Sequence, residues 1–316
     1  MMRYGFTTGS CAAAASKAAA YMLLTGKLKQ NITIQTPKGI LFQTEILETT
    51  RSETEVTCAV RKDGGDDPDI TSGTLIFSTV RFADREKKIP GQNNRQLSGI
   101  HVEAMQEKRA VICIDGGEGV GRVTKPGLDQ QVGNAAINHV PREMITKEVL
   151  EVCRLVDYKG GLAVEIFVPE GEQLAEQTFN PRLGIKGGIS ILGSSGIVEP
   201  MSSQAILDTI RVELRQRRAE GYVYVAVAPG NYGLDYLHER YPEFHAVPVV
   251  KTSNFIGDTL DMAAAARFEE VLLVGHVGKL VKVAGGIMNT HSHTADCRTE
   301  LFCTHAALSS QLNAVR

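Results

Sequence analysis

The sequence predicts a two-domain α/β protein, in which an N-terminal α+β domain precedes a Rossmann-like, doubly wound domain with a mainly parallel sheet. The chain has 316 residues, more than the about 250–300 at which a single core stops growing. Strand patterns cluster in the first half, whereas short apolar strands alternate with amphipathic helices in the second. We place the boundary in the Pro- and Gly-containing stretch 179–186, which gives domains of residues 1–183 and 184–316.

The first half opens with an alanine-rich helix. Hydroxyl side chains at residues 7–10 can cap it, residues 11–20 are almost all small, and Gly26 is suited to its C-terminal cap. β-Branched and alternating residues between turn signals then predict strands. These strands span residues 31–35, 40–47, 55–61, 75–82, 110–114 and 162–168, with a helix over 141–156.

The second half has a different pattern. Its strands are short and wholly apolar, which is typical of strands buried on both faces of a parallel sheet. Amphipathic stretches separate them. The predicted strands are 188–192, 222–228, 247–250 and 271–274, and the predicted helices are 202–219, 258–267, 279–284 and 295–313.

Composition narrows the class of protein. A formal net charge of −2 and a pI near 6.5 argue against a nucleic-acid-binding protein, which normally carries a basic patch. No apolar run approaches the about 20 residues of a membrane span, and the first residues lack the apolar core of a secretory signal. The six cysteines form no CxxC pair, which favours reduced, largely buried thiols. We therefore expect a soluble cytoplasmic protein, and the sequence leaves open whether it forms a homo-oligomer.

Four loops follow strands of the predicted parallel sheet, where open α/β sheets bind their ligands. All four are small, polar or Gly-rich, which suits a nucleoside-like ligand close to the backbone. The alternative is that βα turns are Gly-rich only to reverse the chain. The loop 251–254 is one of the four, and in the other three the candidate residues are Gly193, Ser194, Ser195, Gly196, Gly230, Asn231, Gly275 and Gly278.

Two segments of the first half are candidates for polar ligands. Thr7, Thr8 and Ser10 stand at a helix start, where free N–H groups hold anions, although plain capping explains them equally well. Asp66 and Asp67 belong to an acidic turn whose spacing misses the EF-hand pattern. That turn is either solvated or docks a hydroxyl or amide of a substrate.

A glycine loop follows the predicted strand 110–114. Its glycines fit no register of the dinucleotide-binding motif, and residues 275–279 lack the spacing of a phosphate-binding P-loop. ATPase and ordinary dehydrogenase activities are therefore disfavoured. Glu118, Arg122 and Lys125 emerge from the glycine loop, and its cations suit the carboxylates of a polyanionic substrate.

Histidines provide the remaining candidates. His291 and His293 with Asp296 resemble metal ligands, but residues two apart project to opposite sides of an extended chain, so we expect no protein-bound metal. His276, at a predicted strand end, is a better functional candidate, and a half-buried structural histidine is the alternative.

The chain resembles the cobalt-precorrin-5B C1-methyltransferase family of anaerobic cobalamin biosynthesis. The matching motifs run in order along nearly the whole sequence. One departure is His139, where we expect proline. The motifs are GFTTGSCAAAA at 5–15, KDGGDDPD at 62–69, GEGVGRVTKPGL at 117–128, NPRLGIKGGISILG at 180–193, GIVEPMS at 196–202, NFIGD at 254–258 and GHVGKLVK at 275–282.

The resemblance implies S-adenosylmethionine as methyl donor and a carboxylate-rich tetrapyrrole as acceptor, with cobalt carried by the substrate rather than the protein. The implied reaction methylates ring carbon C1 of cobalt-precorrin-5B to give cobalt-precorrin-6A. We expect the donor on the glycine loops of the second domain and the acceptor between the domains. If a base is needed, His276 is the first candidate and Asp258 the second. The alternatives are a non-catalytic tetrapyrrole carrier and a nucleotide-linked α/β enzyme.

Overall fold

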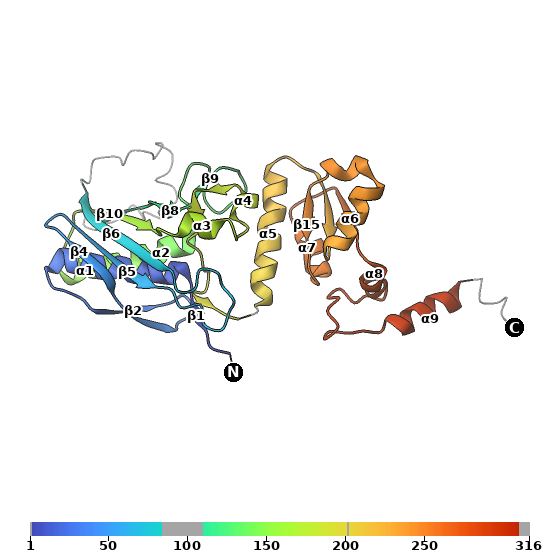
Figure 1. Cartoon of the computed structure of the whole chain (residues 1–316), viewed down its shortest axis with the longest axis horizontal. Helices are drawn as coiled ribbons and strands as arrows, with labels where there is room; N and C mark the ends of the chain where they lie inside the picture. The colour runs from blue at the N-terminus through green and yellow to red at the C-terminus, as the bar shows by residue number, and fades with distance from the viewer. Residues whose placement is uncertain (1, 84–109, 201, 310–316) are drawn as a thin grey trace. The chain divides into compact units, whose positions relative to one another are not determined.

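The structure, a computed structural model, describes residues 2–83, 110–200 and 202–309. Its fold is mixed α/β, and the chain divides into two compact units (Figure 1). The first unit comprises Met1–Thr124 and Asp129–Met201, and the second comprises Lys125–Leu128 and Ser202–Arg316. The boundary therefore lies later in the chain than the sequence predicts.

The first unit is built on a five-stranded sheet of order β4-β5-β6-β10-β7. Neighbouring strands run antiparallel, except that β10 and β7 are parallel. Four of these strands were expected close to their observed bounds: β6 and β7 alternate between buried and less buried side chains, whereas β5 and β10 contain runs of three and four buried residues. The strands are β4 (Leu47–Arg51), β5 (Glu55–Arg61), β6 (Leu75–Ala83), β7 (Val111–Gly116) and β10 (Gly161–Phe167).

The single strand predicted over 40–47 is wrong, because the chain breaks there. Strand β3 (Leu41–Glu45) forms a hairpin with β2 (Asn31–Gln35) and leaves β4 to join the larger sheet. At the break, the amide of Ile46 bonds outside the ladder, to the carbonyl of Gln30 at 2.7 Å. Glu48 then adopts a positive φ of 49°, which turns the chain.

Two helices, α1 (Thr8–Thr25) and α2 (His139–Leu155), pack against each other, and α1 also packs on β5 and β6 (Figure 1). The alanines of α1 are wholly buried and bring its backbone close to the sheet. The Cys58 thiol donates to the Ala15 carbonyl at 3.3 Å, and the hydroxyls of Ser16 and Ser78 lie 2.8 Å apart. Gly26 ends α1 in the left-handed conformation, as expected.

Short strand pairs complete the first unit and explain the late boundary. Here β1 (Gly5–Phe6) pairs with β13 (Ile197–Val198), β9 (Arg122–Val123) with β11 (Ile185–Lys186), and β8 (Gly119–Val120) with β12 (Gly188–Ile189). The strand predicted over 188–192 therefore belongs to the first unit. A side chain on Gly188 would lie 2.1 Å from the Gly119 carbonyl oxygen, so this pairing depends on a glycine at position 188. Two short helices, α3 (Gly171–Ala175) and α4 (Asn180–Leu183), lie between β10 and β11 in sequence.

The second unit contains a parallel three-stranded sheet with β14 (Tyr224–Ala228) between β15 (Val249–Lys251) and β16 (Glu270–Leu273). Val225, Val227 and Val250 form its core with Ile210 and Leu214 of helix α5. The helices of this unit are α5 (Ser203–Ala219), α6 (Asn231–Arg240), α7 (Ile256–Ala265), α8 (Val277–Ala284) and α9 (Arg298–Leu308), with a 3₁₀ turn at Pro242–Ala246.

The helix predicted over 295–313 corresponds to α9, which has no buried residue, and positions 310–313 lie outside the described residues. Helix α6 was not predicted. No helix in the described ranges combines the length and the apolar character needed to cross a membrane. All six cysteines are free, and Cys297 and Cys303 are exposed, so only part of the set matches the expected burial.

Candidate functional site

The start of α1 is joined to the loop Leu192–Gly196 by a dense set of hydrogen bonds. The Thr8 hydroxyl donates to the Leu192 carbonyl at 3.2 Å and accepts from its amide at 3.0 Å. The Gly9 amide donates to the same carbonyl at 3.0 Å. The Ser10 hydroxyl donates to the Gly196 carbonyl at 2.6 Å. The two segments form one interlocked structure.

These bonds bear on the anion site expected at this helix start. Thr7 caps α1 by accepting from the Ser10 amide at 3.2 Å, and Thr7, Thr8 and Ser10 are all buried. The amides of the first turn are thus largely occupied by protein oxygens. Capping and loop attachment account for all three hydroxyls, which is the alternative that the sequence left open.

The loop of Gly193, Ser194, Ser195 and Gly196 is also placed differently from the expectation. It belongs to the first unit and packs on α1, so it does not follow a strand of the parallel sheet. A side chain on Gly193 would lie 2.3 Å from Thr7 Oγ1, and one on Gly196 would lie 2.8 Å from Thr36 Cβ. Close packing against protein explains these two glycines.

The acidic turn binds its own chain. Asp63 pairs with the Arg3 guanidinium, and Asp66 accepts from the Arg3 amide at 2.6 Å. Asp69 accepts from buried Lys62 at 2.5 Å. Burial alone would raise the pKa of the Asp69 carboxyl, but hydrogen bonds from Lys62 and Thr71 outweigh it and hold that pKa below its ordinary value. Asp67 lies in the same turn, and its amide donates to the Gly64 carbonyl at 3.4 Å.

The glycine loop places Arg122 beside an acid that the sequence analysis missed. The Arg122 guanidinium binds both carboxylate oxygens of Asp115, at 2.7 and 3.2 Å, and the Gly116 carbonyl at 2.6 Å. Lys186 stands directly opposite Arg122 in the β9–β11 ladder, so both side chains lie on the same side of this strand pair. Lys186 is exposed and, among the described residues, has no ion-pair partner. Glu118 is exposed nearby in sequence.

Lys125 does not accompany Arg122. It belongs to the second unit, where it pairs with Glu220 at the end of α5 at 3.3 Å. Burial raises the pKa of the Glu220 carboxyl, yet hydrogen bonds from Arg217 and Lys125 hold it below its ordinary value. The two cations expected to share one anionic ligand are therefore in different units, each with a carboxylate of its own.

Three loops converge at the carboxyl edge of the parallel sheet. A side chain on Gly275, after β16, would lie 3.1 Å from Pro229, after β14, and one on Gly233 would lie 2.8 Å from the Val274 carbonyl. From the loop after β15, Asn254 bonds to Lys279 of α8 at 3.0 Å. Around Gly230, by contrast, an added side chain would meet nothing within 4 Å.

This edge coincides with a reversal of strand order. From β14 the chain crosses to β15 on one side and then returns to β16 on the other. Ligands of open α/β sheets bind at such a switch point. Helices α6 and α8 begin there, at Asn231 and Val277, and Tyr232 (84% exposed) and Val277 (57% exposed) leave apolar surface uncovered. Open space, exposed apolar groups and helix N-termini therefore meet at one place.

His276 caps helix α8. Its Nδ1 accepts a hydrogen bond from the Gly278 amide at 3.1 Å, and the ring is exposed. While this bond holds, the neutral ring carries its proton on Nε2 and has no free lone pair with which to act as a base. Asp258 is exposed in the first turn of α7, where a carboxylate stabilises the helix N-terminus.

The His291 segment does not gather ligands. The rings of His291 and His293 lie 5.2 Å apart, and Asp296 binds Arg298. Within the described part of the chain, no three His, Cys, Asp or Glu side chains are grouped closely enough to hold a metal ion.

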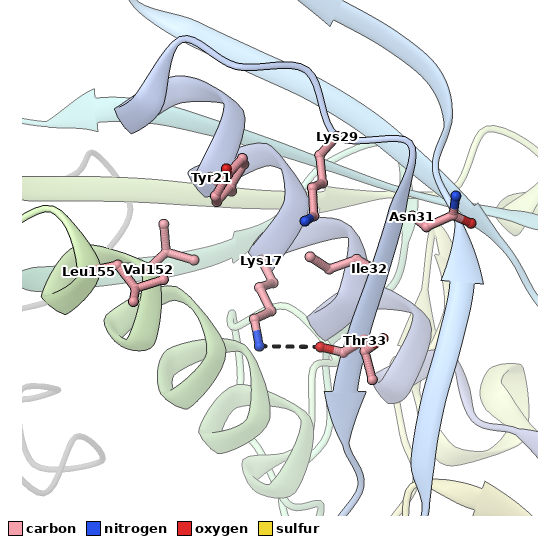
Figure 2. A pocket seen from close by; sticks show the side chains of 8 residues that line it. All are labelled: Lys17, Tyr21, Lys29, Asn31, Ile32, Thr33, Val152 and Leu155. Atoms are coloured by element: carbon pink, nitrogen blue, oxygen red, sulfur yellow. Dashed lines mark hydrogen bonds between the residues drawn. The ribbon is translucent and has the colours of Figure 1, made fainter.

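A cavity of about 270 Å³ lies in the first unit, between α1, α2 and β2 (Figure 2). Lys17 reaches across it to the Thr33 carbonyl at 3.2 Å, and it also pairs with buried Glu148 at 2.7 Å. Lys29 lies over the Tyr21 ring, 5.0 Å from its centre. Both cations are occupied within the protein, and none of the sequence candidates lines this cavity.

Comparisons with known proteins identify the family. The CbiD family model matches residues 1–200. The chain belongs to the CbiD family. Curated relatives are named cobalt-precorrin-5B C(1)-methyltransferase: that of Ruminiclostridium cellulolyticum is 46% identical over 97% of this chain and 73% of its own length. That of a Thermoanaerobacter species is 49% identical over 97% of this chain and 76% of its own.

A crystal structure described as a cobalamin biosynthesis protein (cbiD) from Archaeoglobus fulgidus is also similar, with 24% identity and a TM-score of 0.45 over 95% of this chain and 84% of that one. The family assignment rests on the sequence relatives, which run through both units. It agrees with the resemblance noted in the motifs.

Proposed function

We propose that this CbiD-family protein transfers a methyl group from S-adenosylmethionine to ring carbon C1 of cobalt-precorrin-5B, giving cobalt-precorrin-6A. The relatives' shared name supports the reaction. The observation that carries the donor assignment is the open edge of the parallel sheet, where Gly230 leaves room beside exposed Tyr232, and where exposed Val277 begins α8. We infer that the second unit is a Rossmann-like domain and that this edge holds the donor's nucleoside.

The edge fits such a donor in shape and polarity. The space beside Gly230 admits a ligand against the backbone, and no side chain caps the start of α6, so its first amides can serve as donors there. Exposed aromatic and aliphatic side chains suit the faces of an adenine ring. Gly230, Asn231, Gly275 and Gly278 therefore remain our donor-site candidates, while Gly193, Ser194, Ser195 and Gly196 support the α1 start from within the first unit.

For the acceptor we propose the strand pair β9–β11. Arg122 and Lys186 face each other there. Asp115 already pairs with Arg122, whereas Lys186 has no ion-pair partner among the described residues, so the strand pair can take a further negative charge beside Lys186. Carboxylate side arms of the tetrapyrrole would supply that charge. Glu118, which is exposed in the same glycine loop, is our candidate for contacting a polar edge of that substrate. Asp66, Asp67, Thr7, Thr8, Ser10 and Lys125 then act indirectly, through the local structure that each of them holds in its own unit.

The donor's methyl group is bonded to a sulfonium, so the S–CH3 bond breaks as the C1–CH3 bond forms and neutral S-adenosylhomocysteine leaves. The protein's residues therefore orient the donor and the acceptor and exclude water, and they need not activate the methyl group. Orientation of two reactants can lower the barrier by about 7–11 kcal/mol. His276 holds the start of α8. With Nδ1 engaged, its Nε2–H can donate a hydrogen bond to a ligand, and Asp258 is the remaining candidate for accepting a proton.

Methyl-labelled S-adenosylmethionine and cobalt-precorrin-5B test the reaction directly. Label found on C1 of the product supports it, whereas uptake of tetrapyrrole without transfer identifies a carrier. For the donor site, Gly230→Thr fills the open space with a residue that still caps α6. We expect a loss of at least about tenfold in S-adenosylhomocysteine affinity with unchanged urea unfolding. Unchanged affinity would move the donor site elsewhere.

A further inference from the structure

Lys279 connects two of the three loops at the sheet edge. It lies in the first turn of α8, which follows β16, and its ammonium donates to the Asn254 side-chain oxygen at 3.0 Å, in the loop that follows β15. Strands β15 and β16 flank β14. The Lys279–Asn254 pair therefore links the loops that follow the two outer strands of this sheet.

Asn254 is itself held in place. Its backbone carbonyl accepts from the Thr290 amide at 2.9 Å, and its side-chain oxygen lies 3.4 Å from the Thr290 hydroxyl. The amide oxygen that receives the Lys279 ammonium is therefore fixed in position. It orients the ammonium without neutralising its charge, because an amide carries none.

The charge around Lys279 is unbalanced. No carboxylate of the described residues lies within ion-pair distance of its ammonium. One helical turn away, the Lys282 ammonium is buried and donates to the carbonyls of Ala295 at 2.8 Å and Thr290 at 3.3 Å. Its nearest acid, Asp296 at 3.7 Å, is shared with Arg298.

Burial, and then the neighbouring Lys282 charge, hold the pKa of Lys279 below its ordinary value. Both causes disfavour a cation at this position. An anion bound beside Lys279 would offset the repulsion from the Lys282 charge. The site therefore has a fixed cation, and among the described residues no carboxylate lies within ion-pair distance of it.

We propose that Lys279 binds the α-carboxylate of the methyl donor, with Asn254 holding the ammonium in position. The inference rests on the proposed function, because that function supplies the donor. Among ligands of the proposed reaction, the donor combines a nucleoside, which suits the open edge at Gly230, with a single carboxylate at its other end. Three carbons separate that carboxylate from the sulfonium, so the cation at Lys279 contacts the carboxylate end.

The test compares two ligands on four proteins. S-Adenosylhomocysteine and its decarboxylated analogue differ only in the carboxylate, so calorimetric titration of both isolates its contribution. The proteins are the wild type, Lys279→Met, Lys279→Arg and, as a control cation at the same edge, Lys251→Met, which removes an exposed lysine at the end of β15. Urea unfolding of each confirms that it is folded.

We expect Lys279→Met to weaken S-adenosylhomocysteine binding by at least about tenfold, the size of one charge-assisted hydrogen bond. The decarboxylated analogue should bind all four proteins alike, Lys279→Arg should recover part of the loss, and Lys251→Met should bind as the wild type does.

Several results would overturn the proposal. If Lys279→Met weakens the binding of both ligands equally, then Lys279 only supports the fold. If Lys251→Met loses as much affinity, then the general positive charge of this edge, rather than a contact with Lys279, attracts the carboxylate. Unchanged S-adenosylhomocysteine binding in Lys279→Met would mean that the ammonium does not contact the donor's carboxylate. If the wild-type protein binds neither nucleoside, with or without tetrapyrrole, then the donor site of the proposed function fails instead.

Discussion

The Thr8 hydroxyl and the Leu192 backbone bond to each other in both directions, the hydroxyl donating to the carbonyl at 3.2 Å and accepting from the amide at 3.0 Å. The two residues are 184 positions apart. This pair joins the first turn of α1 to the loop that ends the first unit.

Replacing Thr8 with Val keeps the shape of the side chain and removes both bonds. The Leu192 amide is part-buried, so losing its partner costs an amount near the lower end of the about 1–3 kcal/mol of a buried group. We therefore expect Thr8→Val to lower the free energy of unfolding in urea by that amount. The control is Thr44→Val, because the Thr44 hydroxyl is exposed. Equal effects of the two changes would contradict a specific role for the pair.

Gly196 provides a second test of the same contact. Both Gly196 (φ 78°) and Gly39 (φ 84°) have left-handed backbones, but only at Gly196 would a side chain meet protein, at 2.8 Å from Thr36 Cβ. Gly39→Ala should cost about 1 kcal/mol, from the backbone alone. Gly196→Ala should cost at least about 1 kcal/mol more, from overpacking, as measured by thermal and urea unfolding. Similar losses of stability at both positions would show that the loop around Gly196 moves to accommodate a side chain.

The Asp69–Lys62 pair should make stability depend on pH. The pKa of Asp69 is lowered in the folded chain, so its contribution is complete above the unfolded value of about 3.9 and is lost as pH falls through the folded value. Asp69→Asn leaves the buried Lys62 without a carboxylate, which costs about 3–5 kcal/mol at neutral pH. The difference in unfolding free energy between wild type and Asp69→Asn should shrink below pH 4. A difference that is constant from pH 7 to 3 would rule out this origin.

Two substitutions separate the capping role of His276 from a catalytic one. Asn can cap a helix as His276 does, and Ala cannot. If His276 acts as a cap, His276→Asn should retain methyl transfer, whereas His276→Ala should lose about 1 kcal/mol of stability and part of its donor affinity. Steady-state kinetics with donor titration distinguishes the cases: a large fall in kcat in both variants, at unchanged KM, would restore the ring as an acid or base.

Local patterns predicted the elements whose residues alternate regularly. Strands 31–35 and 55–61 were located to the residue, because every second side chain is apolar and turn residues bound them. The break at Ile46 was missed, since residues on both sides of it favour extended structure. Helix α6 was missed because turn-forming residues 229–233 dominate its start, although Leu234 and Leu237 already have helical spacing.

The candidate site was predicted less well than the fold. Gly193 and Gly275 look alike as loop glycines, yet one packs on Thr7 and the other on Pro229. They differ only in the residue that each contacts, which is distant in sequence and cannot be inferred from the neighbouring residues. Lys125 was grouped with Arg122 because they are three residues apart, but the chain passes from one unit to the other between them. Lys279 was part of a quoted motif, and its uncompensated charge became visible only through what surrounds it.

The four residues Lys125–Leu128 have a consequence for anyone who dissects this protein into fragments. The chain enters the second unit for four residues, where Gly127 packs against α5 so closely that a side chain would lie 2.7 Å from Gln216 Cα, and then goes back. Cutting once, after Met201, therefore yields a longer piece with an unsupported loop and a shorter piece with a bare helix face. Neither is a faithful stand-in for its half of the protein, and mixing the two should restore more order than either shows alone.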